Sequence, residues 1–181
     1  MIFKPLPLTG AYAINLEKKE DHRGFFARSF CLEELAKQGL DMKIAQINNS
    51  MSNYKGTLRG LHFQYPPKAE IKIIRCIRGS IWDVIVDIRK DSSTYGRWYG
   101  IELNESNRSL LYVPKGFAHG FLSLTDDAEI IYLVSETYSP AQEGTLRWDD
   151  PFHKILWPIQ PQEISQKDTD APNWQDDFSI K

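Results

Sequence analysis

The sequence contains little of what marks several large classes of protein. Its 181 residues include only two cysteines, Cys31 and Cys76, and their spacing fits no metal-binding motif. No apolar run approaches the ~20 residues that cross a membrane. The N-terminal stretch MIFKPLPLTG lacks the basic and apolar regions of a secretion signal. We therefore expect a cytoplasmic protein with reduced thiols and no membrane contact.

An excess of charge of one sign is also missing. The 22 basic and 24 acidic residues are interspersed, the formal net charge is −2, and the pI is near 6.1. Nucleic-acid-binding domains usually carry a basic patch or stripe, and none stands out here. We therefore expect no nucleic-acid partner, although a local basic cluster could bind a phosphorylated small molecule.

The length fits a single domain over residues 1–181, because a chain of this size can bury roughly 70% of the surface that it exposes when unfolded. No internal repeat or low-complexity segment divides it. From about residue 170 the stretch DAPNWQDDFSIK is polar, and we predict a peripheral C-terminal tail there.

What the sequence does have is a succession of short β-rich runs separated by Gly, Pro, Asn and Asp. In one of them, large apolar side chains at even positions from 82 to 88 alternate with Asp83, Ile85 and Asp87. This period of two is typical of a strand with two different faces. The predicted strands lie within 71–79, 80–90, 97–104, 110–116 and 129–138.

Only one segment is a convincing helix, the stretch CLEELAKQGL at 31–40, with Gly39 as its C-terminal stop. Many strands with one or two short helices predict an all-β protein. The expected architecture is a double-sheet jelly roll or a similar barrel.

Two histidine-containing stretches stand out within this β pattern. The stretch PKGFAHGF at 114–121 has the spacing P-x-G-x-x-H and resembles the second motif of the cupin superfamily. Metal-binding cupins carry H-x-H in their first motif, whereas this chain has His62, Phe63 and Gln64 in the corresponding stretch. Since Gln64 removes a strong metal ligand, we expect neither a metal nor another cofactor. A metal-dependent cupin enzyme stays a less favoured alternative.

A second resemblance covers nearly the whole chain. A series of stretches, each weak alone, follows the order of the motifs of the dTDP-4-dehydrorhamnose 3,5-epimerase family, often called RmlC. The stretches are 21–30, 46–50, 56–64, 71–96, 112–121, 148–151 and 164–168. The resemblance implies a metal-free, dimeric jelly roll that inverts carbons 3 and 5, or one of them, of a nucleoside-diphosphate 4-keto-6-deoxy sugar. Such enzymes serve the biosynthesis of deoxysugars and surface polysaccharides.

Inverting a carbon beside a ketone needs a base, a group that stabilises the enolate oxygen, and an acid on the opposite face. His62 suits the base, because an imidazole titrates near neutral pH. The resemblance assigns the histidine's carboxylate partner to Asp168, the cation at the keto oxygen to Lys72, and the proton donor to Tyr132. Taken alone, each residue has an ordinary structural explanation. His62 could make a backbone contact, and Lys72 could be a solvated strand residue. Tyr132 could be a core aromatic, and Asp168 could be a turn or capping carboxylate.

The resemblance also assigns substrate-binding residues. Arg59, whose planar fork suits phosphate oxygens, would bind the diphosphate. The other predicted contacts within one chain are Gln46, Asn48, His119, Tyr138 and Glu143.

Three further residues concern the neighbouring subunit and the base. Arg23 and Phe26 correspond to residues that reach the neighbouring site, which implies a homodimer; the alternatives are an ion pair with Asp21 and core packing. Arg28 stands where the family usually has glutamate. Because arginine only donates hydrogen bonds, it suits cytosine, so a CDP-linked 4-keto deoxysugar is the alternative substrate. A non-catalytic sugar-nucleotide binder is a third hypothesis.

Overall fold

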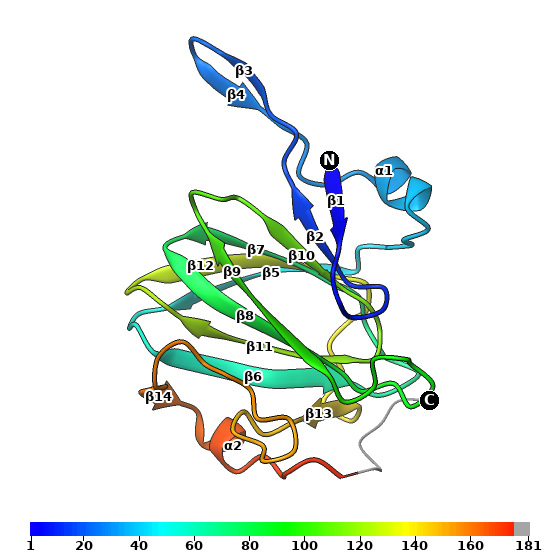
Figure 1. Cartoon of the computed structure of the whole chain (residues 1–181), viewed down its shortest axis with the longest axis vertical. Coiled ribbons are helices and arrows are strands. Elements are labelled where there is room, and N and C mark those ends of the chain that lie inside the picture. The colour runs from blue at the N-terminus through cyan, green and yellow to red at the C-terminus, as the bar shows by residue number, and fades with distance from the viewer. Residues whose placement is uncertain (176–181) are drawn as a thin grey trace.

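Two β-sheets face each other across an apolar interior (Figure 1). The structure, a computed structural model, describes residues 1–175. In the first sheet the strands follow the order β1 (Ile2–Pro5), β2 (Tyr12–Asn15), β10 (Leu110–Val113), β7 (Lys72–Arg78), β12 (Ala128–Val134) and β5 (Gln46–Ser52). In the second the order is β13 (Glu143–Thr145), β6 (Thr57–Gln64), β11 (Phe117–Ser123), β8 (Ser80–Asp87) and β9 (Trp98–Asn104), and β14 (Glu163–Ile164) pairs with β6.

Successive strands alternate between the two sheets. The chain passes from β5 to β6, β7 and β8, and again from β10 to β11, β12 and β13, changing sheet at each step. This alternation is typical of a double-sheet jelly roll. The predicted β fold is confirmed, and the two short helices are α1 (Leu32–Lys37) and α2 (Gln166–Thr169).

Strand β8 shows how the alternating sequence builds the core. Ile81 and Ile85 point into the space between the sheets, whereas Val84 and Val86 belong to a second apolar cluster on the other face. That second cluster includes Leu146, Ile155 and Trp174 of the C-terminal segment. The two predicted faces of this strand are therefore both buried.

Helix α1 is shorter than the predicted 31–40. It ends at Lys37, because the next residues turn back: Gly39 N–H donates to the Ala36 carbonyl at 2.9 Å and Leu40 N–H to the Leu35 carbonyl at 3.0 Å. Gly39 has a φ of +71°, a conformation that glycine adopts without steric cost. The predicted stop at Gly39 is confirmed. Residues 38–40, which were predicted as the end of the helix, form the turn that follows it.

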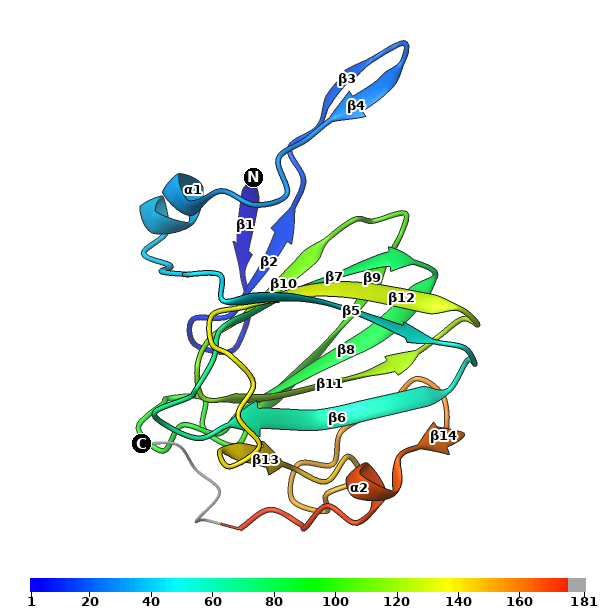
Figure 2. The ribbon, with the colours of Figure 1, turned by 180° about the vertical axis from the view of Figure 1, so that it is seen from behind.

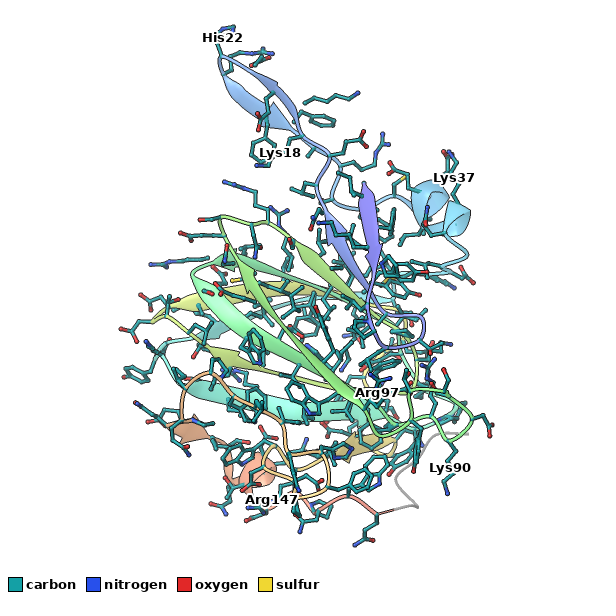
Figure 3. The ribbon with its side chains drawn as sticks, in the orientation of Figure 1. Lys18, His22, Lys37, Lys90, Arg97 and Arg147 are labelled. Carbon is teal, nitrogen blue, oxygen red and sulfur yellow. The ribbon has the colours of Figure 1, made fainter. Side chains whose placement is uncertain are left out.

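A hairpin of β3 (Lys19–Asp21) and β4 (Gly24–Phe26) projects beyond the two sheets (Figure 1). Every residue of its two strands is exposed. His22 lies at its tip and Lys18 near its base (Figure 3).

The C-terminal segment folds back beneath β6, where β13, β14 and α2 lie (Figure 2). The Trp174 ring stacks on Phe152 with centroids 6.2 Å apart, and Ala171 is buried. These apolar contacts hold the predicted peripheral tail against the rest of the chain as far as residue 175, while 176–181 lie outside the described residues. Within the described range, no helix is long and apolar enough to cross a membrane.

Candidate active site

Strand β6 presents Arg59 and His62 to one cavity although they are three positions apart. In a regular strand such residues point to opposite faces. Here three steps along β6 match only two along β11, so an extra residue is inserted between them. Gly60 lies in this irregularity with a φ of +119°, and a Cβ there would lie 2.5 Å from the Gly120 Cα. The close approach of the two strands therefore requires glycine.

The cavity lies between the sheets and consists of two adjoining hollows of about 520 and 410 Å³. His62, Lys72 and Tyr132 line both hollows. His62 comes from the second sheet and the other two from the first, so the base and the proton donor predicted from the sequence face one cavity from opposed sheets. The remaining predicted residues that line the cavity are Arg59, His119 and Asp168 in the larger hollow, and Gln46, Asn48, Tyr138 and Glu143 in the smaller one.

His62 is paired with a buried carboxylate. Its Nε2 lies 2.6 Å from the Oδ1 of Asp168, which is 3% exposed. The other oxygen, Oδ2, accepts from the Gly60 N–H at 3.2 Å, and Ser165 caps helix α2 by accepting from the Asp168 N–H. Burial alone would raise the pKa of the Asp168 carboxyl, but the hydrogen bonds from His62, Gly60 and Ser165 outweigh it and lower the pKa.

The pairing also fixes the tautomer of the imidazole. An ionised carboxylate can only accept, so the proton resides on Nε2 of His62 and the lone pair on Nδ1. A histidine held in this way can take a proton at Nδ1 while Asp168 stabilises the resulting imidazolium.

Lys72 and Tyr132 provide the opposite side of the cavity. Lys72 is 8% exposed, and its Nζ lies 3.1 Å from Glu70 Oε1 and 3.3 Å from the carbonyl oxygen of His62. Burial raises the pKa of the Tyr132 hydroxyl, the charge of Glu70 adds to this, and the charge of Arg59 opposes it. Tyr132 is therefore protonated at neutral pH and can donate.

A second histidine–carboxylate pair lies beside the first. His119 is directly opposite His62 in the pairing of β11 with β6, and its Nε2 lies 2.9 Å from the buried Oδ1 of Asp83. Arg59 donates to the Met51 carbonyl at 3.1 Å from one end of its guanidinium, Nη2. Its Nε lies 3.4 Å from Ser52 Oγ, and within residues 1–175 its Nη1 makes no hydrogen bond, so N–H groups are left for an anion.

The smaller hollow has an aromatic side chain at its rim. Tyr138 is 59% exposed, its hydroxyl donates to Glu143 Oε2 at 3.0 Å, and its backbone N–H donates to Gln46 Oε1 at 2.7 Å. Burial would raise the pKa of Glu143, but hydrogen bonds from Lys167 and Tyr138 lower it. The Tyr138 ring is thus held in place with its surface open to a planar ligand.

Three predicted residues do not line the cavity of their own chain. Arg23 is paired with Asp21 at 2.7 Å on the projecting hairpin, which is the alternative that the sequence left open. Phe26 is 69% exposed, so the alternative that it packs into the core of this chain is wrong. Arg28 is paired with Glu34 at 2.7 Å. It stays a prediction that Arg23 and Phe26 contribute to the neighbouring subunit's site.

Gln64 is not free to act as a metal ligand. Its Oε1 accepts from the Ser139 N–H at 2.6 Å, and its Nε2 donates to the Lys68 carbonyl at 3.0 Å. Within residues 1–175, no group of three or more His, Cys, Asp and Glu side chains is placed to hold a metal ion.

Sequence reasoning missed four residues that shape the site: Glu70, Asp83, Ser165 and Lys167. Two of them left a signal. Ser165 stands three residues before Asp168, which is the spacing of a helix N-cap. Asp83 is an acidic residue on a face that must be buried, which demands a partner such as His119. Glu70 and Lys167 have no comparable signal, because charged residues before a strand or in a short helix are ordinary.

Known proteins resemble this chain over most of its length. The family model described as "dTDP-4-dehydrorhamnose 3,5-epimerase" matches residues 5–176. A curated dTDP-4-dehydrorhamnose 3,5-epimerase from Methanothermobacter thermautotrophicus is 43% identical over 171 residues, 93% of this chain and 90% of the relative.

Two solved structures share the fold over most of the chain. The dTDP-4-dehydrorhamnose 3,5-epimerase of Elizabethkingia anophelis is 37% identical, with a TM-score of 0.94 over 96% of both chains. The RmlC of Legionella pneumophila, solved in complex with dTDP-4-keto-L-rhamnose, is 33% identical, with a TM-score of 0.87 over 96% of this chain and 98% of that one. With its sequence matched from residue 5 to residue 176 and its fold shared, this chain belongs to the dTDP-4-dehydrorhamnose 3,5-epimerase family of isomerases.

Proposed function

We propose that this protein epimerises a dTDP-linked 4-keto-6-deoxyhexose at carbons 3 and 5, as a dTDP-4-dehydrorhamnose 3,5-epimerase, in deoxysugar and surface polysaccharide biosynthesis. One observation carries the proposal. A histidine paired with a carboxylate and a protonated tyrosine line a single cavity from opposed sheets, and a buried lysine lies between the two hollows of that cavity. This is the arrangement that inversion beside a ketone requires.

In the first step, Nδ1 of His62 takes the proton from the carbon next to the ketone. The electron pair of that C–H bond forms the enolate, whose negative charge collects on the keto oxygen. Lys72 donates a hydrogen bond to this oxygen, and Asp168 stabilises the imidazolium. An oxyanion donor of this kind contributes roughly 3–4 kcal/mol to the transition state.

In the second step, the Tyr132 hydroxyl delivers its proton to the opposite face of the same carbon. The enolate electrons form the new C–H bond and the ketone is restored. The resulting tyrosinate regains a proton and the imidazolium loses one, so the enzyme returns to its starting state. Each positioned proton transfer is worth about 10²–10⁴-fold in rate.

The nucleotide is proposed to lie toward Arg59 and Tyr138. The free N–H groups of Arg59 suit the diphosphate, and the exposed ring of Tyr138 suits stacking on the base. Gln46 and Asn48 provide polar contacts between them. A CDP-linked sugar is the alternative substrate, because Arg28 offers hydrogen-bond donors where glutamate would offer an acceptor.

We further propose a homodimer in the cytoplasm, with one domain per chain. A two-stranded hairpin whose Arg23 and Phe26 are 78% and 69% exposed has too little core to be stable alone. Docking against the neighbouring subunit's cavity would bury the Phe26 ring. The free state of Cys31 and Cys76 agrees with a reducing compartment.

The test is proton NMR of the protein in deuterated water with dTDP- and CDP-4-keto-6-deoxyglucose. Deuterium entering at both carbons 3 and 5 supports the proposal, and the faster substrate identifies the base. Deuterium at one carbon identifies a single-site epimerase. Absence of exchange, with dTDP still bound, would establish the non-catalytic binder. Loss of activity on chelation, restored by one metal, would favour the metal-dependent cupin enzyme.

A further inference from the structure

The ammonium group of Lys72 is held at two points. Its Nζ lies 3.1 Å from Glu70 Oε1 and 3.3 Å from the carbonyl oxygen of His62. An ammonium has three N–H donors; Lys72 donates one to the His62 carbonyl and forms an ion pair with Glu70, so at least one donor remains for a further partner. Lys72 lines both hollows of the cavity, and the remaining donor is therefore available to a ligand there.

Glu70 is itself held from behind. Gln64 Nε2 lies 3.2 Å from Glu70 Oε2, and Gln64 is 4% exposed. The Gln64 amide is fixed by the Ser139 N–H at 2.6 Å and the Lys68 carbonyl at 3.0 Å. The carboxylate of Glu70 thus connects a rigid buried amide to the lysine.

The segment that carries Glu70 is also tied to the neighbouring strand. Ile71 N–H donates to Ser135 Oγ at 2.8 Å, and the Ser135 N–H donates to the Ile71 carbonyl at 3.0 Å. Glu70 can therefore act as a fixed reference point for the long, flexible side chain of Lys72.

We propose that Glu70, supported by Gln64, is a positioning residue that aims the third N–H of Lys72 at the enolate oxygen. The inference rests on the proposed function of the same cavity. A free lysine side chain samples many rotamers, and a donor fixed before the reaction needs no reorganisation when the oxygen becomes charged. Glu70 supplies this order without touching the substrate.

The location of the pair distinguishes positioning from ordinary stabilisation. Glu70 and Lys72 are 12% and 10% exposed in their side chains, and both line the hollow that His62 and Tyr132 share. By contrast, the ion pair of Lys68 with Glu136, at 2.7 Å, is more exposed and lies outside both hollows. Glu136 thus provides a matched control of the same residue type.

The experiment compares Glu70→Ala, Glu70→Gln and Glu136→Ala with the parent protein. We expect Glu70→Ala to lower kcat roughly 10–100-fold, a part of the ~10²–10³-fold cost of losing an oxyanion donor outright. Deuterium exchange should fall in parallel, while KM and the dTDP affinity stay within about threefold. Glu70→Gln keeps one oxygen facing Lys72 but turns its NH₂ group toward the Gln64 Nε2 donor, so it should recover only part of kcat, and Glu136→Ala should match the parent.

A kcat for Glu70→Ala within twofold of the parent would overturn the inference. So would a loss that appears only in KM, or a Glu70→Gln variant as slow as Glu70→Ala. A readout without substrate is the ¹⁵N signal of the Lys72 ammonium, identified by its absence in Lys72→Arg. If the signal is unchanged in Glu70→Ala, Glu70 does not hold the lysine. If the signal shifts in Glu70→Ala while the parent protein epimerises neither sugar, the positioning stands and the proposed function fails.

Discussion

Replacing Asp168 with asparagine tests the pairing on which the proposed chemistry depends. The two carboxylate oxygens accept from two donors, His62 Nε2 at 2.6 Å and the Gly60 N–H at 3.2 Å. Asparagine has one oxygen and one NH₂ group in their place, so one of these two contacts must be lost.

Both orientations of the asparagine are harmful. If the NH₂ group faces Gly60, a buried backbone N–H loses its acceptor, which costs about 1–3 kcal/mol. If it faces His62, Nε2 must accept and the proton moves to Nδ1, where the base needs its lone pair. In either case the negative charge that stabilises the imidazolium is gone. We therefore expect kcat to fall about 10²–10⁴-fold, the range of a positioned proton transfer.

The assay measures kcat for the preferred 4-keto sugar, the dTDP affinity, and the ¹⁵N shifts of the His62 ring. Asp170→Asn is the control, because Asp170 is an exposed carboxylate at the C-terminal end of the same helix. The affinity should stay within about threefold, since Asp168 stabilises a charge that forms only during the reaction. An Asp168→Asn variant with kcat within threefold of the parent, in the same tautomer, would refute the reasoning.

Three other predictions concern the strands and the core. Gly60→Ala should lower the free energy of unfolding by about 1–3 kcal/mol, because the added Cβ would overlap Gly120. Chemical denaturation measures this change, and an unchanged denaturation midpoint would contradict the prediction. Tyr132→Phe should still exchange the substrate proton through the base but yield about 10²-fold less inverted product by NMR, whereas Tyr54→Phe, at an exposed tyrosine, should match the parent. Burial would raise the pKa of Asp87, but its hydrogen bonds lower it below the unfolded value, so its stabilisation is full above about pH 4 and is lost as pH falls through the folded pKa. The difference in Tm between the parent and Asp87→Asn should therefore shrink only as the pH falls below about 4, and a constant difference would be evidence against this assignment.

The strands were predictable because each carries its signal locally. The alternation through β8 and the glycine at 79 between β7 and β8 depend only on neighbouring residues, and both are confirmed. The end of α1 was less predictable, because the turn around Gly39 and the helix before it share the same residues.

Most of the predicted residues line the cavity, but the sequence could not show how they are arranged there. The family motifs identified His62 and Asp168. Only the fold shows that these residues, 106 positions apart in the sequence, come within 2.6 Å of each other. The irregular pairing of β6 with β11 around Gly60 was also not predictable, because a strand with a strict period of two places Arg59 and His62 on opposite faces. Glu70 escaped notice because its importance lies in contacts with Gln64 and Lys72, which no periodicity encodes.

The return of the C-terminal segment beneath β6 has a consequence for the protein during its synthesis. Every strand of both sheets precedes Asp168 in the chain, so the ribosome completes the whole scaffold before it makes the carboxylate that partners His62. Domains can begin to fold while they are being made, from the N-terminus onward. A nascent chain can therefore form its sheets, and the smaller hollow of its cavity, while His62 is still without its carboxylate. On the proposed mechanism, full activity waits until helix α2 has left the exit tunnel and Asp168 can pair with His62.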